Sequence, residues 1–295
     1  MTKRRRGCWE TWAELTLLLL LCAVVCSGGF KPVVIVHGLF DGPKQFQTLS
    51  EFIRKDHPGT DVTLLSAFDY LDSLQPLWKQ VRTLAAVLQG ALQRPGGVHL
   101  LCFSQGGLVC RALLSISPQH NVHSFISLSS PQAGQYGDTD YLKKFFPKYL
   151  KEALFHFCYT EAGQKVSICN YWNDPHQQSR FLQKNHFLPL INGGQLHNQS
   201  AAWRENFLRI RKLVLIGGPD DDVITPWQSS VFGFYDSREQ VADMRDQEFY
   251  RTDAFGLRTL DARGDVSLCV HAGVKHVQWH SNYSVFHSCM KKWLT

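Results

Sequence analysis

The chain has 295 residues, of which 44% are hydrophobic and 19% are charged, and its formal net charge at pH 7 is +6. The apolar fraction excludes wholesale disorder, and the length suits one large α/β domain. The sequence after residue 30 lacks the Lys/Arg cluster of a nucleic-acid-binding protein and the roughly 18 continuous apolar residues of a stable membrane span.

The N-terminal segment has the pattern of a secretory signal. Residues 3–6 are basic, residues 15–25 are apolar, and small residues follow at 26–29. This order is typical of a cleaved signal peptide. The apolar run is short for a hydrocarbon core of about 30 Å, which favours cleavage over a retained signal anchor. We predict a signal peptide at residues 1–28 and a single mature domain at 29–295.

The mature sequence alternates strand and helix patterns. Short apolar runs predict strands at 33–36, 62–65, 98–103, 124–128, 212–216 and 266–270. Helical spacing of apolar residues predicts a helix at 74–92, and a second helix at 108–116 follows a tight turn at 104–107. Strands that alternate with helices indicate an α/β fold with a mostly parallel sheet.

The alternation lapses between residues 131 and 209, where aromatic residues are frequent. We expect a helical insertion there that covers the carboxyl edge of the sheet. Some of its aromatic side chains are expected to line a long apolar groove, and the others to be ordinary core residues. A closing segment from about 277 to 294 completes the domain.

The strongest local signal surrounds Ser104, which stands between a predicted strand and a predicted helix. A serine on such a sharp turn is exposed at the top of the sheet, and small residues two positions before and after it let strand and helix approach. Those positions hold Cys102, in place of the usual glycine, and Gly106. The strand, the helix and the upstream His37-Gly38 favour a nucleophile over an ordinary serine in a glycine-rich turn.

A serine nucleophile needs a base, which is oriented by an acid, and in this fold their chain order is Ser, Asp or Glu, His. The candidates after Ser104 are Asp220, Asp221 and Asp222 for the acid, and His271, His276, His280 and His287 for the base. Chain order alone leaves the choice open, and the carboxylates that are not used would form a solvated loop. The backbone N–H groups of Gln105 and Leu39 are expected to form the oxyanion hole, because Gly38 permits close approach of the backbone.

Cysteines and sequons agree with export. After the signal segment the chain keeps six cysteines, at positions 102, 110, 158, 169, 269 and 289. An even number in an oxidising compartment predicts three disulfides, for which fifteen pairings exist. Short separations favour pairing of neighbours, with buried free thiols at Cys102 and Cys110 as the alternative. Asn198 and Asn282 begin N-glycosylation sequons, which would place both on the surface.

Several strings, spread over nearly the whole mature chain, resemble the palmitoyl-protein thioesterase family. They are His37-Gly38-Leu39-Phe40-Asp41, Ser104-Gln105-Gly106-Gly107-Leu108-Val109-Cys110-Arg111-Ala112, Ile126-Ser127-Leu128-Ser129-Ser130-Pro131-Gln132, Gly134-Gln135-Tyr136-Gly137, Asn170-Tyr171-Trp172 and Phe232-Gly233-Phe234-Tyr235. The resemblance implies an α/β-hydrolase fold.

The resemblance also resolves the candidate sites. The family's acid lies five residues before a proline and eleven before the Phe-Gly-Phe-Tyr string, which matches Asp221, and its base lies in the loop before the last helix, which matches His276. The implied disulfides are Cys102–Cys110, Cys158–Cys169 and Cys269–Cys289. Delivery to the lysosome by a receptor for mannose phosphate on Asn-linked glycans is likewise implied.

The activity that the resemblance implies is hydrolysis of long-chain fatty acyl thioesters, such as S-acyl-coenzyme A or S-acylated cysteine, through an acyl-serine and without a metal or redox cofactor. A secreted carboxyl-ester lipase or acyltransferase with the same triad is one alternative. A non-catalytic binding module is another, but such a module should have lost part of the triad, and all three residue types are present.

Overall fold

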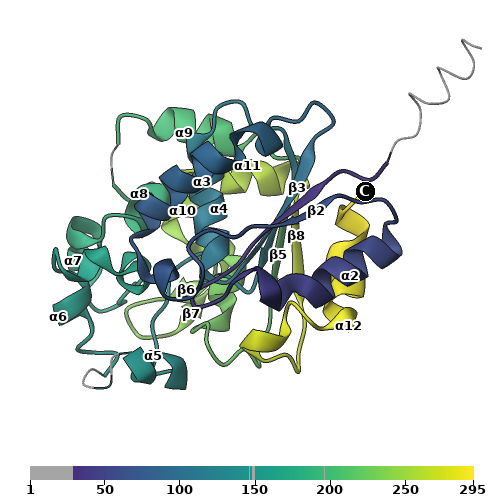
Figure 1. The fold of residues 1–295 in the computed structure, drawn as a ribbon. Coiled ribbons are helices and arrows are strands. Elements are labelled where there is room, and N and C mark those ends of the chain that lie inside the picture. Colours follow the sequence, from purple (N-terminus) through teal and green to yellow (C-terminus); the bar gives the residue numbers. More distant parts are fainter. Residues whose placement is uncertain (1–28, 146, 148–149, 196) are drawn as a thin grey trace, which may run out of the picture. The chain divides into compact units, whose positions relative to one another are not determined.

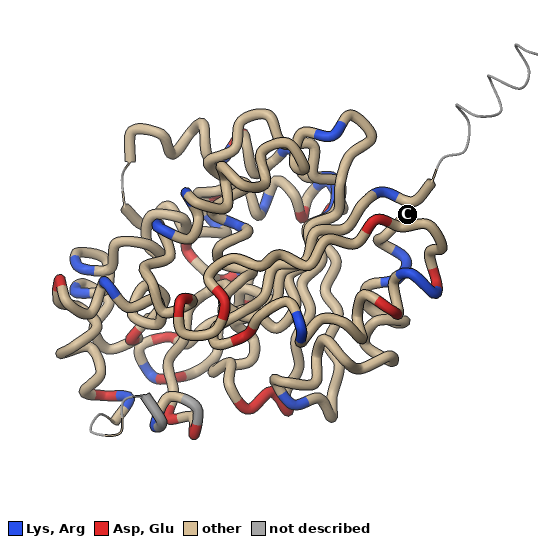
Figure 2. The backbone as a smooth tube through the Cα atoms, in the orientation of Figure 1, with Lys and Arg blue, Asp and Glu red and all other residues tan. Residues whose placement is uncertain are grey.

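The computed structural model describes residues 29–295 except 146, 148–149 and 196, so the predicted signal peptide at 1–28 lies outside the described residues. Residues 31–295 form one compact unit. Lys and Arg are interspersed with Asp and Glu over the elements of this unit (Figure 2).

A six-stranded sheet in the order β2-β1-β3-β4-β5-β8 organises this unit (Figure 1). The strands are β1 (Val33–Val36), β2 (Val62–Leu64), β3 (Val98–Phe103), β4 (Val122–Leu128), β5 (Lys212–Gly217) and β8 (Val266–Val270). Every neighbouring pair is parallel. All residues of β1 and β3 are buried, as expected for parallel strands that are covered on both faces. The predicted fold class is confirmed.

Successive residues of a strand point to opposite faces, and the two faces have separate cores. Val34 and Leu100 pack with α3 (Leu77–Leu92), α4 (Gln105–Ile116) and α9 (Ser200–Phe207). Residues from the alternate positions of the same strands pack on the other face with α2 (Gln47–Asp56), α12 (Tyr283–Val285) and the C-terminal segment. Figure 1 shows α2 and α12 together on one side of the sheet.

Strands β2, β4 and β5 differ from their predicted ranges by one or two residues at one end, and the helices differ more. Helix α4 begins at Gln105 rather than at 108, because Gly106 and Gly107 lie inside its first turn instead of forming the turn before it. The predicted helix at 74–92 is a 3-10 turn at Tyr70–Leu74 followed by α3, which begins after Pro76. Helix α2 was not predicted, although Leu49, Phe52 and Ile53 recur at helical spacing on its apolar side.

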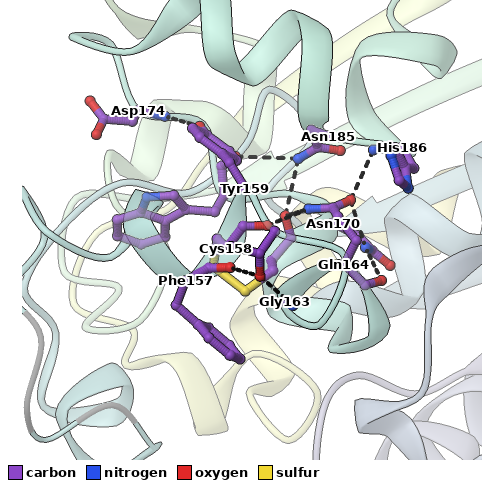
Figure 3. The surroundings of a disulfide bond; sticks show 12 residues. Phe157, Cys158, Tyr159, Gly163, Gln164, Asn170, Asp174, Asn185 and His186 are labelled. Carbon is purple, nitrogen blue, oxygen red and sulfur yellow. Dashed lines mark hydrogen bonds between the residues drawn. A yellow bond between two sulfur atoms is a disulfide. The ribbon is translucent and has the colours of Figure 1, made fainter.

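The segment at 131–209 contains short helices, and in Figure 1 α5 to α8 gather at one end of the sheet. The helices before α9 are α5 (Asp140–Phe145), α6 (Phe155–Cys158), α7 (Gln178–Lys184) and α8 (Leu188–Ile191). Around the Cys158–Cys169 disulfide, polar contacts hold the 131–209 segment together (Figure 3). Gln164 Nε2 donates to the carbonyl oxygens of Cys158 (2.8 Å) and Cys169 (3.1 Å), and Gln164 Oε1 accepts from the backbone N–H of His186 (2.8 Å).

The other two disulfides are also those that the resemblance implied. Cys102–Cys110 joins the end of β3 to α4, and Cys269–Cys289 joins β8 to the C-terminal helical segment. Cys102 and Cys110 are fully buried, but as a disulfide and not as free thiols. The remaining elements are β6 (Phe234–Tyr235), β7 (Val241–Ala242), α10 (Glu248–Arg251) and α11 (Leu257–Ala262).

Candidate active site

Ser104 lies between β3 and α4 with a backbone φ of 53°, and only 8% of the residue is exposed. A positive φ at a serine is strained, and it turns the side chain out of the strand-to-helix elbow. A Cβ atom at Gly38 would lie 2.7 Å from Ser104 Cβ, and one at Gly106 would clash with the carbonyl oxygen of His37. Glycine at position 106 therefore allows the loop after β1 to lie against the elbow. The sequence prediction had instead explained this small residue by the close approach of the strand and the helix.

The structure brings Ser104, His276 and Asp221 together from three distant parts of the chain. His276 Nε2 lies 2.9 Å from Ser104 Oγ. His276 Nδ1 lies 2.9 Å from Oδ2 of Asp221 and 3.1 Å from its Oδ1. The side chains of His276 and Asp221 are 8% and 1% exposed. This arrangement of a hydroxyl, an imidazole and a carboxylate is the geometry that activates a serine.

The carboxylate of Asp221 is surrounded by hydrogen-bond donors. Oδ1 accepts from the backbone N–H groups of Val223 and Ile224, both at 2.9 Å. Oδ2 accepts from Ser129 Oγ and from Trp279 Nε1, the latter at 2.7 Å. Burial alone raises the pKa of Asp221, but the hydrogen bonds from His276 and Ser129 and the charge of His276 outweigh it and lower the pKa to about 2. The carboxylate therefore stays ionised at neutral and at mildly acidic pH.

The neighbouring carboxylates do not reach the imidazole ring, and both residues are exposed, as expected for a solvated loop. They nevertheless accept hydrogen bonds from the backbone of the segment that carries His276. Oδ2 of Asp220 accepts from Gly273 N at 2.7 Å, and Oδ1 of Asp222 accepts from His276 N at 3.0 Å. Sequence reasoning missed this role, which requires the three successive side chains to point in different directions.

The other candidate histidines have different surroundings. His271 Nε2 lies 3.1 Å from Ser284 Oγ, and His287 is exposed. His280 packs its ring against Phe46 and Phe103. Burial, together with the charge of the nearby His276, lowers the pKa of His280 to about 4. His280 is therefore an uncharged residue of the packing beneath the site.

The two predicted oxyanion-hole residues flank Ser104. Gln105 is the first residue of α4, so its N–H has no acceptor within the helix, and Leu39 lines the same pocket as Ser104. Ser73 links the segment that carries Leu39 to the segment that carries Gln105. The sequence prediction did not identify this role of Ser73. Ser73 Oγ accepts from the N–H of Phe40 at 2.8 Å, and the carbonyl oxygen of Ser73 accepts from Gln105 Nε2 at 2.8 Å.

Ser104 lies at a narrow, mainly apolar pocket. The other lining residues come from the loop after β1, the loop after β5 and the 131–209 segment: Leu39, Pro131, Gln135, Leu142, Ile168, Tyr171, Val223 and Ile224. A larger hollow lies at the C-terminal ends of α3 and α4, and its lining includes none of the predicted catalytic residues.

Asn198, the first of the two predicted glycosylation sites, is exposed. Asn282 is half-buried, and its side chain accepts from the N–H of Val285 at 3.2 Å at the start of α12. A glycan attached to Asn282 Nδ2 leaves the accepting oxygen in place, so capping and modification are compatible.

A sequence model of the palmitoyl protein thioesterase family matches residues 32–276. The chain is 54% identical over 282 residues to the lysosomal thioesterase PPT2 of rat and to that of human, covering 95% of this chain and 93% of each relative. It is 40% identical over 288 residues to the lysosomal thioesterase PPT2 homolog of Drosophila melanogaster, with 95% and 99% coverage.

Among solved structures, the mature lipase BlEst2 of Bacillus licheniformis superposes with a TM-score of 0.51 at 16% sequence identity, covering 91% of this chain and 94% of the lipase. Among the described residues, no helix is both long enough and apolar enough to cross a bilayer.

Proposed function

This chain belongs to the palmitoyl protein thioesterase family, and we propose that it hydrolyses long-chain fatty acyl thioesters through an acyl-serine on Ser104. It is a thioester hydrolase of the α/β-hydrolase fold, and like its close relatives it is a lysosomal protein. The observation that supports Ser104 as the nucleophile is its 2.9 Å contact with His276 Nε2, together with the 2.9 Å contact between His276 Nδ1 and Asp221.

In the first half of the reaction, Ser104 Oγ attacks the thioester carbonyl carbon while neutral His276 takes its proton on Nε2. Asp221 accepts the Nδ1–H of His276, which keeps Nε2 free to act as the base, and it stabilises the imidazolium that forms. The backbone N–H groups of Leu39 and Gln105 hold the oxyanion, each contributing about 3 kcal/mol. The imidazolium then gives its proton to the sulfur, the carbon–sulfur bond breaks, and the thiol leaves.

In the second half, His276 takes a proton from a water molecule that attacks the acyl-serine. Collapse of the second tetrahedral intermediate breaks the carbon–oxygen bond, returns the proton to Ser104 Oγ and releases the fatty acid. All proton transfers in this scheme use side chains of the protein and water. The apolar pocket at Ser104 supports a hydrocarbon acyl group as the part of the substrate that is bound.

The experiment compares kcat/KM for matched acyl thioesters and oxyesters, with coenzyme A and an S-acylated cysteine peptide as the two leaving thiols. We expect a clear preference for thioesters and for long acyl chains. A preference for the oxyester would instead assign the same triad to a carboxyl-ester lipase or acyltransferase. Absence of hydrolysis with every substrate, in a folded protein, would favour a binding module.

We also propose that the chain is made as a precursor, cut near residues 26–29, and sorted by a receptor that binds mannose phosphate on its glycans. The exposure of Asn198 and the compatible cap at Asn282 support both sequons as acceptors. N-terminal sequencing of the secreted protein tests the cleavage. Asn198→Gln and Asn282→Gln should each remove one glycan, and free mannose 6-phosphate should block uptake of the secreted protein by cells.

A further inference from the structure

Asp221 binds more donors than the orientation of a histidine requires. One hydrogen bond with Nδ1 suffices for that role. Oδ2 of Asp221 nevertheless also accepts from Ser129 Oγ and from Trp279 Nε1 (2.7 Å). Sequence reasoning gave neither residue a function, and the mechanism above uses neither. These two side-chain donors act on the same oxygen that lies closest to His276.

Ser129 is fixed by the sheet. It follows β4, is fully buried, has a φ of 44°, and its N–H donates to the carbonyl oxygen of Ile216 in β5 at 2.7 Å. Its Oγ also lies 3.2 Å from His276 Nδ1. Ser129 therefore contacts both Asp221 and His276.

Trp279 is the second side-chain donor to the same oxygen of Asp221. It follows His276 by three residues in the same 3-10 segment and is fully buried. Its ring packs against Gly218, where an added Cβ would lie 3.2 Å from Cη2 of the ring. The indole N–H therefore ties the segment that carries the base to the carboxylate, independently of the imidazole ring itself.

We propose, on the basis of the function proposed above, that Ser129 and Trp279 are positioning residues that weaken the attraction of Asp221 for the His276 imidazolium and so keep His276 an active base at lower pH. Each hydrogen bond to a carboxylate stabilises its charge and draws that charge away from other partners. With these two bonds in place, Asp221 stabilises the imidazolium form of His276 less than it would if Ser129 and Trp279 did not donate to it. The arrangement suits a hydrolase that works in an acidic compartment.

Other charged or titratable groups near His276 also influence when it takes up a proton. They are Asp41 and His37 from the loop after β1, Asp220 and Asp222 from the loop after β5, and Lys275 and His280 from its own segment. Burial raises the pKa of Asp41, against the charges of His276 and His37. None of these groups changes when Ser129 or Trp279 is replaced, so they are a constant background in the comparison that follows.

The test uses Ser129→Ala, which removes the hydroxyl, and Trp279→Phe, which removes the indole N–H and keeps an aromatic ring. Ser130→Ala is the matched control for the first, since Ser130 Oγ pairs with Gln132 Nε2 (3.3 Å) rather than with Asp221. Trp172→Phe is the control for the second, because Trp172 is fully buried and its Nε1 has no partner among the described residues. Thermal unfolding checks that all four variants fold.

The measurement is kcat/KM for a soluble acyl-coenzyme A between about pH 4 and pH 8. In Ser129→Ala and Trp279→Phe we expect the acid limb of the profile to move to higher pH by about half a unit or more. Activity at pH 5, relative to the plateau, should then fall about threefold, with KM nearly unchanged, and the two controls should follow the wild-type profile. Acid limbs that overlie the wild-type limb in both variants would overturn the proposal, even if kcat fell.

A second readout separates this proposal from the proposed function. An alkyl fluorophosphonate labels an activated serine whether or not the natural substrate is a thioester. The pH dependence of Ser104 labelling should show the same displacement in the two variants. If thioesters were not hydrolysed while labelling still shifted, the substrate assignment would fail and the positioning role would stand. Labelling with unchanged pH dependence would overturn the positioning role alone.

Discussion

The backbone N–H of His276 donates to Oδ1 of Asp222 at 3.0 Å, so the residue next to the proposed acid holds the main chain of the proposed base. Asp221 binds the imidazole ring of His276, while Asp222 binds its main chain. Two successive carboxylates thus fix one histidine at two points. The loop after β5 and the segment after β8 are joined at the site by charge-assisted hydrogen bonds, which are stronger than neutral ones.

Ser104→Ala should abolish thioester hydrolysis and leave folding and secretion intact. The hydroxyl is the only part of the side chain that the proposed reaction uses, and loss of a triad nucleophile costs far more than a hundredfold in turnover. Single-turnover assays of the secreted variant measure the residual rate. Turnover above about a hundredth of the wild-type value would show that Ser104 is not the nucleophile.

Alanine substitutions of Asp220, Asp221 and Asp222 should lower kcat by clearly different amounts. Asp221→Ala should cost about 10⁴-fold in kcat, since it removes the partner that sets the tautomer of His276. Asp222→Ala should cost about tenfold, because it frees only the main chain of His276, and Asp222→Asn, which keeps an acceptor oxygen, should restore most of that loss. Asp220→Ala should be the mildest of the three. A larger loss at Asp220 or Asp222 than at Asp221 would contradict the assignment of the acid.

Ser73→Ala should lower kcat more than it raises KM. Ser73 Oγ holds the N–H of Phe40, next to the predicted oxyanion donor Leu39, and a misplaced donor weakens binding of the transition state more than of the substrate. We expect a loss of about tenfold in kcat. The control is Ser66→Ala, whose Oγ donates to Asp69 at 2.7 Å on the same loop. Equal effects of the two variants would show that the loop as a whole, and not the Ser73 contact, matters.

The stability of the fold should decrease as the pH falls below about 6.5, the ordinary pKa of histidine. Burial lowers the pKa of His99 to about 3 and that of His120 to about 4. Both histidines therefore stay neutral in the folded chain at a pH at which the unfolded chain takes up protons. Each contributes its full stabilisation above pH 6.5 and loses about 1.4 kcal/mol per pH unit below it, until its folded pKa is reached.

Thermal unfolding between about pH 7.5 and pH 4.5 measures this slope. The slope should flatten in His99→Leu, which removes one buried imidazole from β3. His287→Leu, at an exposed position, should keep the wild-type slope and serves as the control. A Tm that does not fall with pH in the wild-type protein would contradict the prediction.

The sheet could be predicted, and Ser104 proposed as the nucleophile, because both signals are local. Apolar runs mark β1 and β3, and the strand, turn and helix around Ser104 are contiguous. Helix α2 also has a local signal, the helical spacing of Leu49, Phe52 and Ile53, but these apolar residues are few and the prediction did not use them. The start of α4 was misplaced because Gly106 and Gly107 read as a turn, although the approach of other segments is what requires residues that small.

The rest of the site depends on contacts between distant residues. Chain order alone did not separate Asp221 from its neighbours or His276 from His280, and only the resemblance to a family did. Ser129 and Trp279 lie 92 and 58 positions from Asp221, and a serine or tryptophan carries no sign of such a partner in its own sequence context. Their proposed roles can be inferred only from the structure, in which the end of β4, the loop after β5 and the C-terminal segment lie side by side.

The Cys102–Cys110 disulfide joins β3, which precedes Ser104, to α4, which follows it. Such bonds form in the oxidising lumen of the secretory route and not in the cytosol, where thiols are kept reduced. A copy of the chain that stayed in the cytosol would lack this cross-link, and the strand and helix on either side of Ser104 would then be held together by non-covalent contacts alone.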